Sequence, residues 1–241
     1  MIAAASRSSR SATPSATLGL ARDGAERLAG ALDETALAAI EGVFRSEDGG
    51  KPGVRLRDAS GALGKVLSRG GAVGRIARAW MGPASRPVRI LLFNKRAEAN
   101  WALGLHQDRT IAVAARHEVD GFGPWTVKAG QLHVQPPQSV IDRMLTLRIH
   151  LDDVGADAAP LLILAGSHRL GRLCEAAIDA AVSANPPVAC LARRGDVWIY
   201  ATAIVHGSDA YRATGGQRRV LQIDYAADDL PGGLAWALPD G

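Results

Sequence analysis

The spacing of apolar residues changes near Pro87, from a period of about 3.6 before it to a period of two after it. The helical period predicts helices that begin near Asp23 and Asp33 and a third amphipathic stretch over residues 63–80. Helices followed by strands favour an α+β fold, in which the N-terminal helices pack outside an antiparallel sheet or barrel.

Short segments with alternating apolar residues follow Pro87, separated by Gly, Pro and Asp turns. The predicted strands are 88–93, 144–151, 161–164, 188–192, 197–205 and 218–225, with one helix, 172–184, among them. The stretch 118–137 shows no such period and is predicted to be an irregular loop. Loops of that length are usually lids or binding loops, although a solvated surface excursion is the alternative.

Two of the predicted strands have one apolar and one polar face. The polar face carries Thr146, Arg148 and His150 in the first strand and Arg218, Gln222 and Asp224 in the second. Unpaired polar groups are costly to bury. This face therefore either meets bulk solvent or lines a wet cavity inside a barrel.

A candidate metal site begins at His106 and Asp108, which would point to the same side of an extended chain. His206 closes the predicted strand 197–205. Two histidines and one carboxylate suit the facial triad of a non-haem Fe(II) oxygenase, which leaves coordination positions open. Arg218 begins the next strand, where a hairpin would return it beside His206 to grip a dicarboxylate.

The remaining histidines fit the triad less well. His150 and Asp152 repeat the same spacing, but Asp152 is interpreted as part of a turn and His150 as a pocket-wall or structural residue. His168 is expected to start a turn or helix. His117 and His133 flank or lie in the long loop, where exposed histidines usually ligate nothing.

Composition excludes several classes of protein. The net charge is +4, but the arginines are scattered rather than gathered into the stripe that a nucleic-acid binder uses. The sequence contains no run of eighteen apolar residues, so no membrane span is expected. Cys174 and Cys190 are too few for a disulfide scaffold, and free thiols without a secretory signal indicate the cytoplasm. Residues 1–17 are expected to form a disordered tail, and 18–241 one domain.

Several motifs occur in a characteristic order: LLFNKRAEANW, LHQDRTIAV, GFGPWTVKAG, HVQPP, LRIHLDD, AGSHRLGRL, and HGS followed by RRVLQIDYA. On these motifs the chain resembles, from about Gly53 to Ala226, the phytanoyl-CoA dioxygenase family of Fe(II)/2-oxoglutarate-dependent oxygenases, especially its short bacterial members. The resemblance implies a double-stranded β-helix, which is a jelly-roll barrel like that of the cupins. It agrees with the order of helices and strands.

The resemblance also implies roles for individual residues. His106, Asp108 and His206 would bind iron, and Arg218 would pair with the distal carboxylate of 2-oxoglutarate. Gln107 and Ser208 would line that cosubstrate, as would Arg148, which stands where some relatives have a tryptophan. The chain departs from the family pattern at Leu105, at Ala158–Ala159–Pro160 and at Ala165. None of these positions is a proposed metal ligand, and the departures would affect only the mouth of the pocket.

The expected reaction is hydroxylation of an unactivated C–H bond in a small molecule, with release of succinate and CO2. A carboxylate at Asp108 argues against halogenation, whereas desaturation or ring formation stays possible. A cupin-like metal-dependent isomerase or hydrolase is an alternative, although it would have no need of Arg218. A non-catalytic barrel of the same fold is another.

The sequence narrows the substrate only to its general chemistry. Arg109, Arg148 and Arg55 would form an arginine-rich wall, which indicates an acidic or polar small molecule. In the long loop, Trp125 would supply an apolar lip to the pocket, and Lys128 or His133 a polar contact. The protein is expected to be a monomer or a homodimer.

Overall fold

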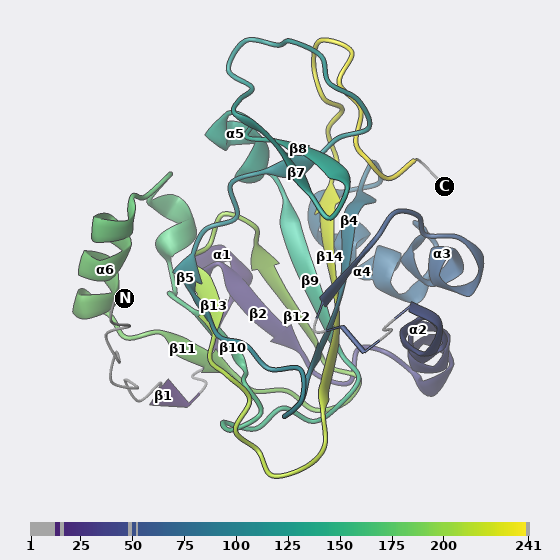
Figure 1. Ribbon diagram of the computed structural model, residues 1–241, viewed down its shortest axis with the longest axis vertical. Coiled ribbons are helices and arrows are strands. Elements are labelled where there is room, and N and C mark those ends of the chain that lie inside the picture. The colour runs from purple at the N-terminus through teal and green to yellow at the C-terminus, as the bar shows by residue number, and fades with distance from the viewer. Residues whose placement is uncertain (1–12, 15–16, 48–49, 52, 240–241) are drawn as a thin grey trace.

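Two β-sheets face each other at the centre of the fold, and helices cover the outer face of the larger one (Figure 1). This computed structural model describes residues 13–14, 17–47, 50–51 and 53–239. The arrangement confirms the predicted jelly-roll α+β fold. Within the described residues, no helix is long and apolar enough to cross a membrane.

The larger sheet is antiparallel and has the strand order β2-β12-β9-β14-β4-β3. Its strands are β2 (Ala25–Leu28), β3 (Gly53–Leu56), β4 (Arg86–Lys95), β9 (Leu145–His150), β12 (Val197–Ala201) and β14 (Arg218–Ala226). Strands β9 and β14 pair at the centre of this sheet, with Gln222 opposite Arg148 and Leu221 opposite Ile149. The polar and apolar faces of neighbouring strands therefore coincide.

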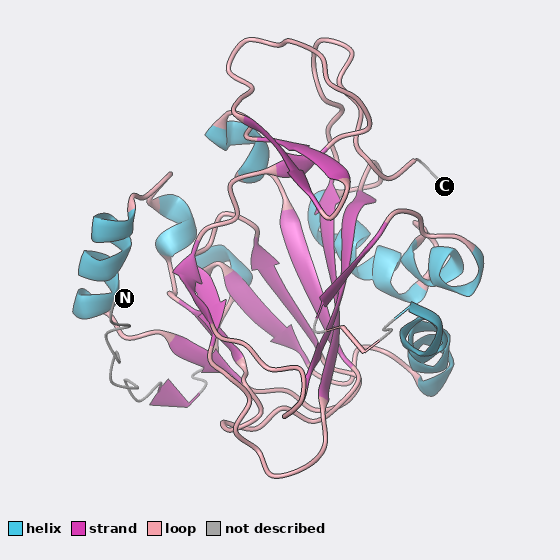
Figure 2. Ribbon diagram, in the orientation of Figure 1, coloured by secondary structure: helices cyan, strands magenta, loops and turns pink. Residues whose placement is uncertain are grey.

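The smaller sheet has the order β1-β11-β10-β13-β5. Its strands are β1 (Thr13–Pro14), β5 (Leu103–His106), β10 (Leu161–Ile163), β11 (Val188–Cys190) and β13 (His206–Ser208). Only β1 pairs in parallel, so part of the expected tail is a strand, and most of the rest lies outside the described residues. Helix α6 (Glu175–Ala184) accompanies this sheet, in the place predicted (Figure 2).

The predicted strand 197–205 is wrong in its second half. The chain leaves the larger sheet after Ala201, turns, and enters the smaller sheet at His206. The predicted hairpin between His206 and Arg218 is wrong for the same reason, since β13 and β14 belong to different sheets. A barrel needs such crossovers, and periodicity alone cannot reveal them.

The expected irregular loop at 118–137 contains a hairpin instead. Strands β7 (Trp125–Lys128) and β8 (Gln131–Val134) pair with each other, and β8 pairs with β6 (Ile111–Ala112). The two turn residues, Ala129 and Gly130, both have positive φ angles, of 50° and 73°. Hairpin turns with this geometry are usually Asn-Gly or Gly-rich, so the alanine concealed the turn in the sequence. The short helix α5 (Gln138–Ile141) follows.

The helix expected near Asp23 is also wrong. Asp23 and Glu26 accept hydrogen bonds from the backbone N–H groups of Gly19 and Leu20, so they cap the single turn α1 (Leu20–Asp23) rather than begin a helix. Gly24 then takes a left-handed conformation, with φ of 79°, and β2 follows.

The remaining helices follow the prediction more closely. Helix α2 (Glu34–Glu47) begins near Asp33 as expected, but the stretch 63–80 forms two helices, α3 (Gly61–Leu67) and α4 (Ala72–Met81). Gly71 separates them, since a Cβ there would lie 2.1 Å from the Lys65 carbonyl oxygen.

The main hydrophobic core lies between helices α2–α4 and the outer face of the larger sheet. The sheet contributes Ile90, Leu92, Leu147, Ile149, Leu221 and Ile223, and the helices contribute Leu37, Ile40, Phe44, Leu67 and Val73. Each side chain of this size gains about 1.5–3 kcal/mol from full burial. This packing turns the polar face of β4, β9 and β14 toward the smaller sheet.

Candidate metal and cosubstrate site

His106, Asp108 and His206 converge on one point between the two sheets. One potential ligand atom from each lies within 4.8 Å of the others. Strands β5 and β13 pair so that His106 is opposite His206, and their ring centroids lie 4.6 Å apart. Gly207 permits this close approach, since a Cβ there would lie 2.7 Å from the Leu103 carbonyl oxygen.

Backbone carbonyl groups fix the orientation of both imidazoles. Nδ1 of His106 lies 2.8 Å from the Gly104 oxygen, and Nδ1 of His206 lies 3.0 Å from the Ile204 oxygen. A carbonyl can only accept, so each Nδ1 carries the proton and each Nε2 keeps a free lone pair. Burial lowers the pKa of His206 to about 4, which keeps its ring neutral and able to bind a metal.

Arg89 on β4 fixes the carboxylate of the triad. Its Nη2 lies 2.5 Å from Oδ2 of Asp108, and its Nε lies 2.5 Å from Oδ2 of the buried Asp224. Burial would raise the pKa of Asp108, but the adjacent Arg89 guanidinium more than offsets it and holds that pKa below its usual range. Asp108 is therefore ionised, and its Oδ1 is left for another partner.

This donor set fits a non-haem iron ion. Two neutral imidazole nitrogens and one carboxylate oxygen on one side of the ion leave the opposite positions open for further ligands. Throughout the described ranges, no other three His, Cys, Asp or Glu residues lie close enough to hold a metal. Cys174 and Cys190 are free, as expected.

A cavity of about 550 Å³ opens beside the triad. Its walls include the predicted residues Gln107, Arg109, Lys128, Arg148, Ser208 and Arg218, together with Arg89, Leu91, Phe93, Ile178 and Gln222. The polar face of the larger sheet therefore lines a cavity, which decides between the two sequence interpretations.

Three buried basic side chains belong to the polar face of the larger sheet: Lys95 on β4, Arg148 on β9 and Arg218 on β14. Lys95 donates to Oγ of Ser208 at 2.5 Å and to the Asp209 carbonyl oxygen at 2.7 Å. Arg148 donates to Oε1 of Gln222 at 3.0 Å, and Arg218 donates to the Ala159 carbonyl oxygen. In the part of the chain that the structure describes, none of the three forms an ion pair with a carboxylate.

These cations fit an anionic ligand. An uncompensated buried charge costs several kcal/mol, so a site that retains three favours an anion between them. Burial, together with the charges of Arg218 and Arg148, lowers the pKa of Lys95 to about 7. The Nε atoms of Arg148 and Arg218 are buried without a hydrogen-bond partner, which leaves donors for a carboxylate.

Gln107 has less freedom than the sequence suggested. Its Nε2 donates to the carbonyl oxygens of Gly171 and Ala203, both at 2.8 Å, and its Oε1 accepts from the Leu173 N–H. The side chain thus ties the segment before α6 to the triad. Arg109 is exposed and donates to the carbonyl oxygen of Leu173.

The three residues proposed for the lid separate in the structure. Lys128 lines the cavity and donates to Oγ1 of Thr110 at 2.7 Å. Trp125 does not line it; its ring packs against the separate hydrophobic cluster that includes Phe122, with Arg116 5.3 Å from the ring centroid. His133 is fully buried, so its expected exposure is wrong: it lies on β8, the middle strand of the three-stranded sheet β6-β8-β7.

The second His-x-Asp pair does not form a site. His150 is buried on the inner face of β9, whereas Asp152 accepts hydrogen bonds from Arg219 on the outer side. His168 lies in the 3₁₀ turn Ser167–Arg169, as predicted.

Sequence reasoning missed Arg89, Lys95 and Asp224 as site residues. The first two share the inward face of β4 with Leu91 and Phe93. Arg89 lies within the predicted strand 88–93, whereas Lys95 lies two residues beyond it, and following the period of two to Lys95 would have placed that residue on the same face.

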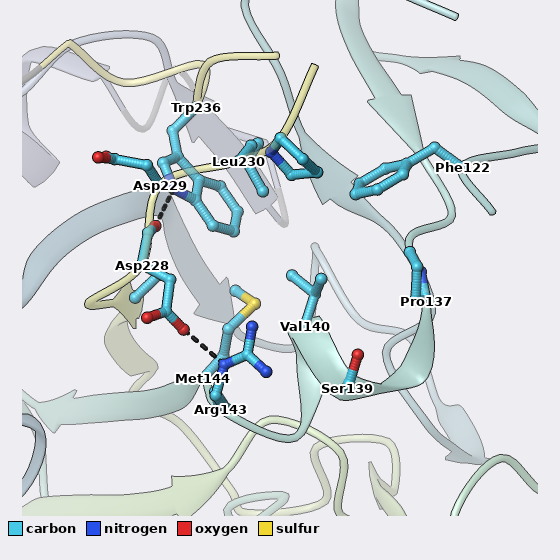
Figure 3. Close-up of a pocket in the computed structure, with 12 residues that line it drawn as sticks. Phe122, Pro137, Ser139, Val140, Arg143, Met144, Asp228, Asp229, Leu230 and Trp236 are labelled. Atoms are coloured by element: carbon cyan, nitrogen blue, oxygen red, sulfur yellow. Dashed lines mark hydrogen bonds and ion pairs between the residues drawn. The ribbon is translucent and has the colours of Figure 1, made fainter. Parts of the chain in front are cut away.

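A second cavity, of about 390 Å³, lies beside α5 and the C-terminal segment (Figure 3). Phe122, Val140, Leu230 and Trp236 form much of its wall, and Arg143 pairs with Asp228 at its edge. It shares no lining residue with the cavity beside the triad.

Comparison with known proteins identifies a family and a fold. Residues 62–220 match the phytanoyl-CoA dioxygenase (PhyH) family. No curated protein matches the chain. Among solved structures it is similar to HygX from Streptomyces hygroscopicus, solved with nickel, 2-oxoglutarate and hygromycin B, with 16% identity and a TM-score of 0.58 over 86% of this chain and 84% of that one.

Two further solved structures have the same fold. The epimerase SnoN, in complex with Fe3+, alpha-ketoglutarate and nogalamycin RO, is 20% identical with a TM-score of 0.59 over 92% of this chain and 91% of its own. AviO1 from Streptomyces viridochromogenes Tue57 is 19% identical with a TM-score of 0.56 over 88% and 94%.

Proposed function

The chain belongs to the phytanoyl-CoA dioxygenase family, whose members use Fe(II) and 2-oxoglutarate, and from that premise we propose that it hydroxylates a C–H bond of a small molecule. The reaction would convert 2-oxoglutarate and dioxygen into succinate and CO2 as the substrate gains one oxygen atom. The supporting observation is that the triad and two buried arginines without a carboxylate partner, Arg148 and Arg218, line one cavity, while the buried Lys95 donates to Ser208 on its wall.

His106, His206 and Asp108 are the proposed iron ligands. The two Nε2 atoms are free because backbone carbonyls hold both Nδ1–H groups, and Oδ1 of Asp108 is free because Arg89 holds Oδ2. The bound iron would supply the oxidising chemistry with dioxygen, while the protein supplies orientation and a shielded pocket.

Arg218, Ser208 and Lys95 are the proposed contacts of the distal carboxylate of 2-oxoglutarate. A guanidinium can donate two parallel hydrogen bonds to one carboxylate, and Lys95 adds a point charge already directed at Ser208. Arg148 and Gln222 would border the same ligand, and Gln107 would hold the cavity wall around it.

The apolar walls would keep the reaction dry. Leu91, Phe93 and Ile178 line the cavity between the polar groups, and water exclusion protects a reactive centre from side reactions. A metal-dependent isomerase or hydrolase that does not use 2-oxoglutarate would have no use for three cations set apart from the metal ligands.

Succinate formation tests the proposal. Purified protein with Fe(II), ascorbate and dioxygen should convert 2-oxoglutarate to succinate slowly alone and faster with a true substrate, whose product gains one oxygen atom by mass spectrometry. Arg78→Gln, on the outer face of α4, should behave like the wild type. Absence of succinate from an iron-loaded, folded protein would contradict the proposal, and a product with no added oxygen would contradict hydroxylation.

A further inference from the structure

A second group of basic residues lies on the wall of the main cavity, away from Lys95 and Arg218. Arg55 on β3 pairs in register with Leu91 on β4, so both side chains lie on the inner face of the sheet and line the cavity. Lys128, the last residue of β7, lines it from the hairpin that Figure 1 shows in its upper part.

Direct contacts hold the segments of these two residues together. Arg57, which follows β3, donates to the Ala129 carbonyl oxygen at the hairpin turn over 3.3 Å. Lys128 donates to Oγ1 of Thr110, two residues beyond Asp108. The two cations are thus fixed on the side of the metal site where Asp108 lies.

The positive charge on this wall has little compensation. Arg55 forms no ion pair within the described residues, and its Nη1 is buried without a hydrogen-bond partner. Asp108 and Asp224 are both engaged by Arg89. Glu175 is the other acidic residue on the cavity wall, and it is exposed at the start of α6.

The cofactors of the proposed function do not remove this excess. The two carboxylates of 2-oxoglutarate would be matched by Lys95, Arg148 and Arg218, and a divalent metal adds more positive charge than Asp108 cancels. Burial lowers the pKa of Lys128, and the charges of Arg89 and Arg55 act in the same direction, although the Asp108 carboxylate opposes them.

We propose that the substrate carries an anionic group, a carboxylate or a phosphate, which Arg55 and Lys128 bind on the Asp108 side of the metal. This inference rests on the proposed function and names the substrate class of the same site. The anionic group would anchor one end of the substrate, so that a carbon further along it faces the iron. Arg109 is left out because it is exposed and its guanidinium is already bonded to Leu173.

Calorimetry on protein preloaded with Ni(II) and saturating 2-oxoglutarate tests this inference. The probes are phenyl phosphate, phenylacetate and the neutral benzyl alcohol. The wild type should bind at least one of the two anions, and which one it prefers distinguishes phosphate from carboxylate. It should bind benzyl alcohol at least tenfold more weakly.

Matched variants locate the binding. Arg55→Gln and Lys128→Gln should each weaken the preferred anion about tenfold or more, Arg55→Lys should retain most of the affinity, and Arg78→Gln should leave it unchanged although it removes the same charge. Binding of neither anion, equal binding of benzyl alcohol, or no loss in Arg55→Gln and Lys128→Gln would overturn the inference. The preloading step separates the two proposals, because a protein that does not use 2-oxoglutarate fails to bind it there, before any substrate probe is added.

Discussion

The two faces of strands β9 and β14 have opposite environments although their residues alternate in one sequence. Leu147, Ile149, Leu221 and Ile223 face helices α2–α4 in a dry core. Arg148, Arg218 and Gln222, from the same strands, line the cavity between the sheets. One face stabilises the fold, and the other carries charges that only a ligand would neutralise.

The comparison indicates where stability and function separate. Substitutions on the outer face should change the free energy of unfolding and spare ligand binding. Substitutions on the inner face should weaken ligand binding and leave the free energy of unfolding nearly unchanged, because an unpaired buried charge contributes little to stability. Sites for ligands often reduce stability in this way.

The largest expected effect is on the metal ligands themselves. Asp108→Ala should reduce succinate formation to background and weaken Fe(II) binding, because only two ligands remain. His150→Ala, in the second His-x-Asp pair, should keep the metal, since His150 and Asp152 lie on opposite sides of the sheet. Iron content and succinate yield check both variants. An active, iron-loaded Asp108→Ala protein would exclude the assignment.

Leu221→Ala tests the outer face. Leu221 is fully buried in the core against the helices, so its truncation should lower the free energy of unfolding by about 2–5 kcal/mol. The dissociation constant of 2-oxoglutarate should change less than about twofold, since the side chain points away from the cavity. Urea denaturation and calorimetry measure the two quantities. A large loss of 2-oxoglutarate affinity in this folded variant would mean that the faces are not independent.

Arg218 and Arg219 are adjacent but point to opposite faces of β14, so they separate the roles of the two faces. Arg218 lines the cavity, whereas Arg219 pairs with Asp152 at 2.6 Å and with Glu41 at 3.3 Å outside it. Arg218→Lys should raise the 2-oxoglutarate requirement roughly tenfold or more, because an ammonium cannot reproduce the bidentate guanidinium. Arg219→Lys should change it little. Titration of succinate formation gives the order, and the reverse order would refute the assigned faces.

The smallest expected effect is a pH dependence from Lys95. Its pKa of about 7 in the free protein rises when a carboxylate binds beside it, because the anion favours the charged amine. The affinity for 2-oxoglutarate should therefore be full below pH 7 and fall by up to about tenfold per pH unit above it. Lys95→Met should bind more weakly and lose this slope. A slope unchanged in Lys95→Met would assign the titration to another group.

Much of the fold and of the candidate site was accessible from the sequence because local periodicity carries the necessary information. Alternation in 144–151 and 218–225 predicted two faces of opposite character, and the structure has both. The spacing of His106 and Asp108 predicted their convergence, and His206 joins them.

The errors arise where long-range contacts override local pattern. Asp23 and Glu26 have capping spacing, yet they cap the preceding turn because the next residues pair as an edge strand with β12. The crossover after Ala201 depends on the second sheet, which no local pattern describes. Arg89 was overlooked because its role follows from Asp108 and Asp224, residues that only the fold brings beside it.

A crystal structure of the protein loaded anaerobically with Ni(II) and 2-oxoglutarate would test the assigned metal and cosubstrate site. We expect a metal bound by Nε2 of His106 and His206 and by Asp108, with a carboxylate of 2-oxoglutarate on Arg218 between the two sheets. A metal held by other residues, or 2-oxoglutarate bound away from the inner face of β14, would contradict this assignment.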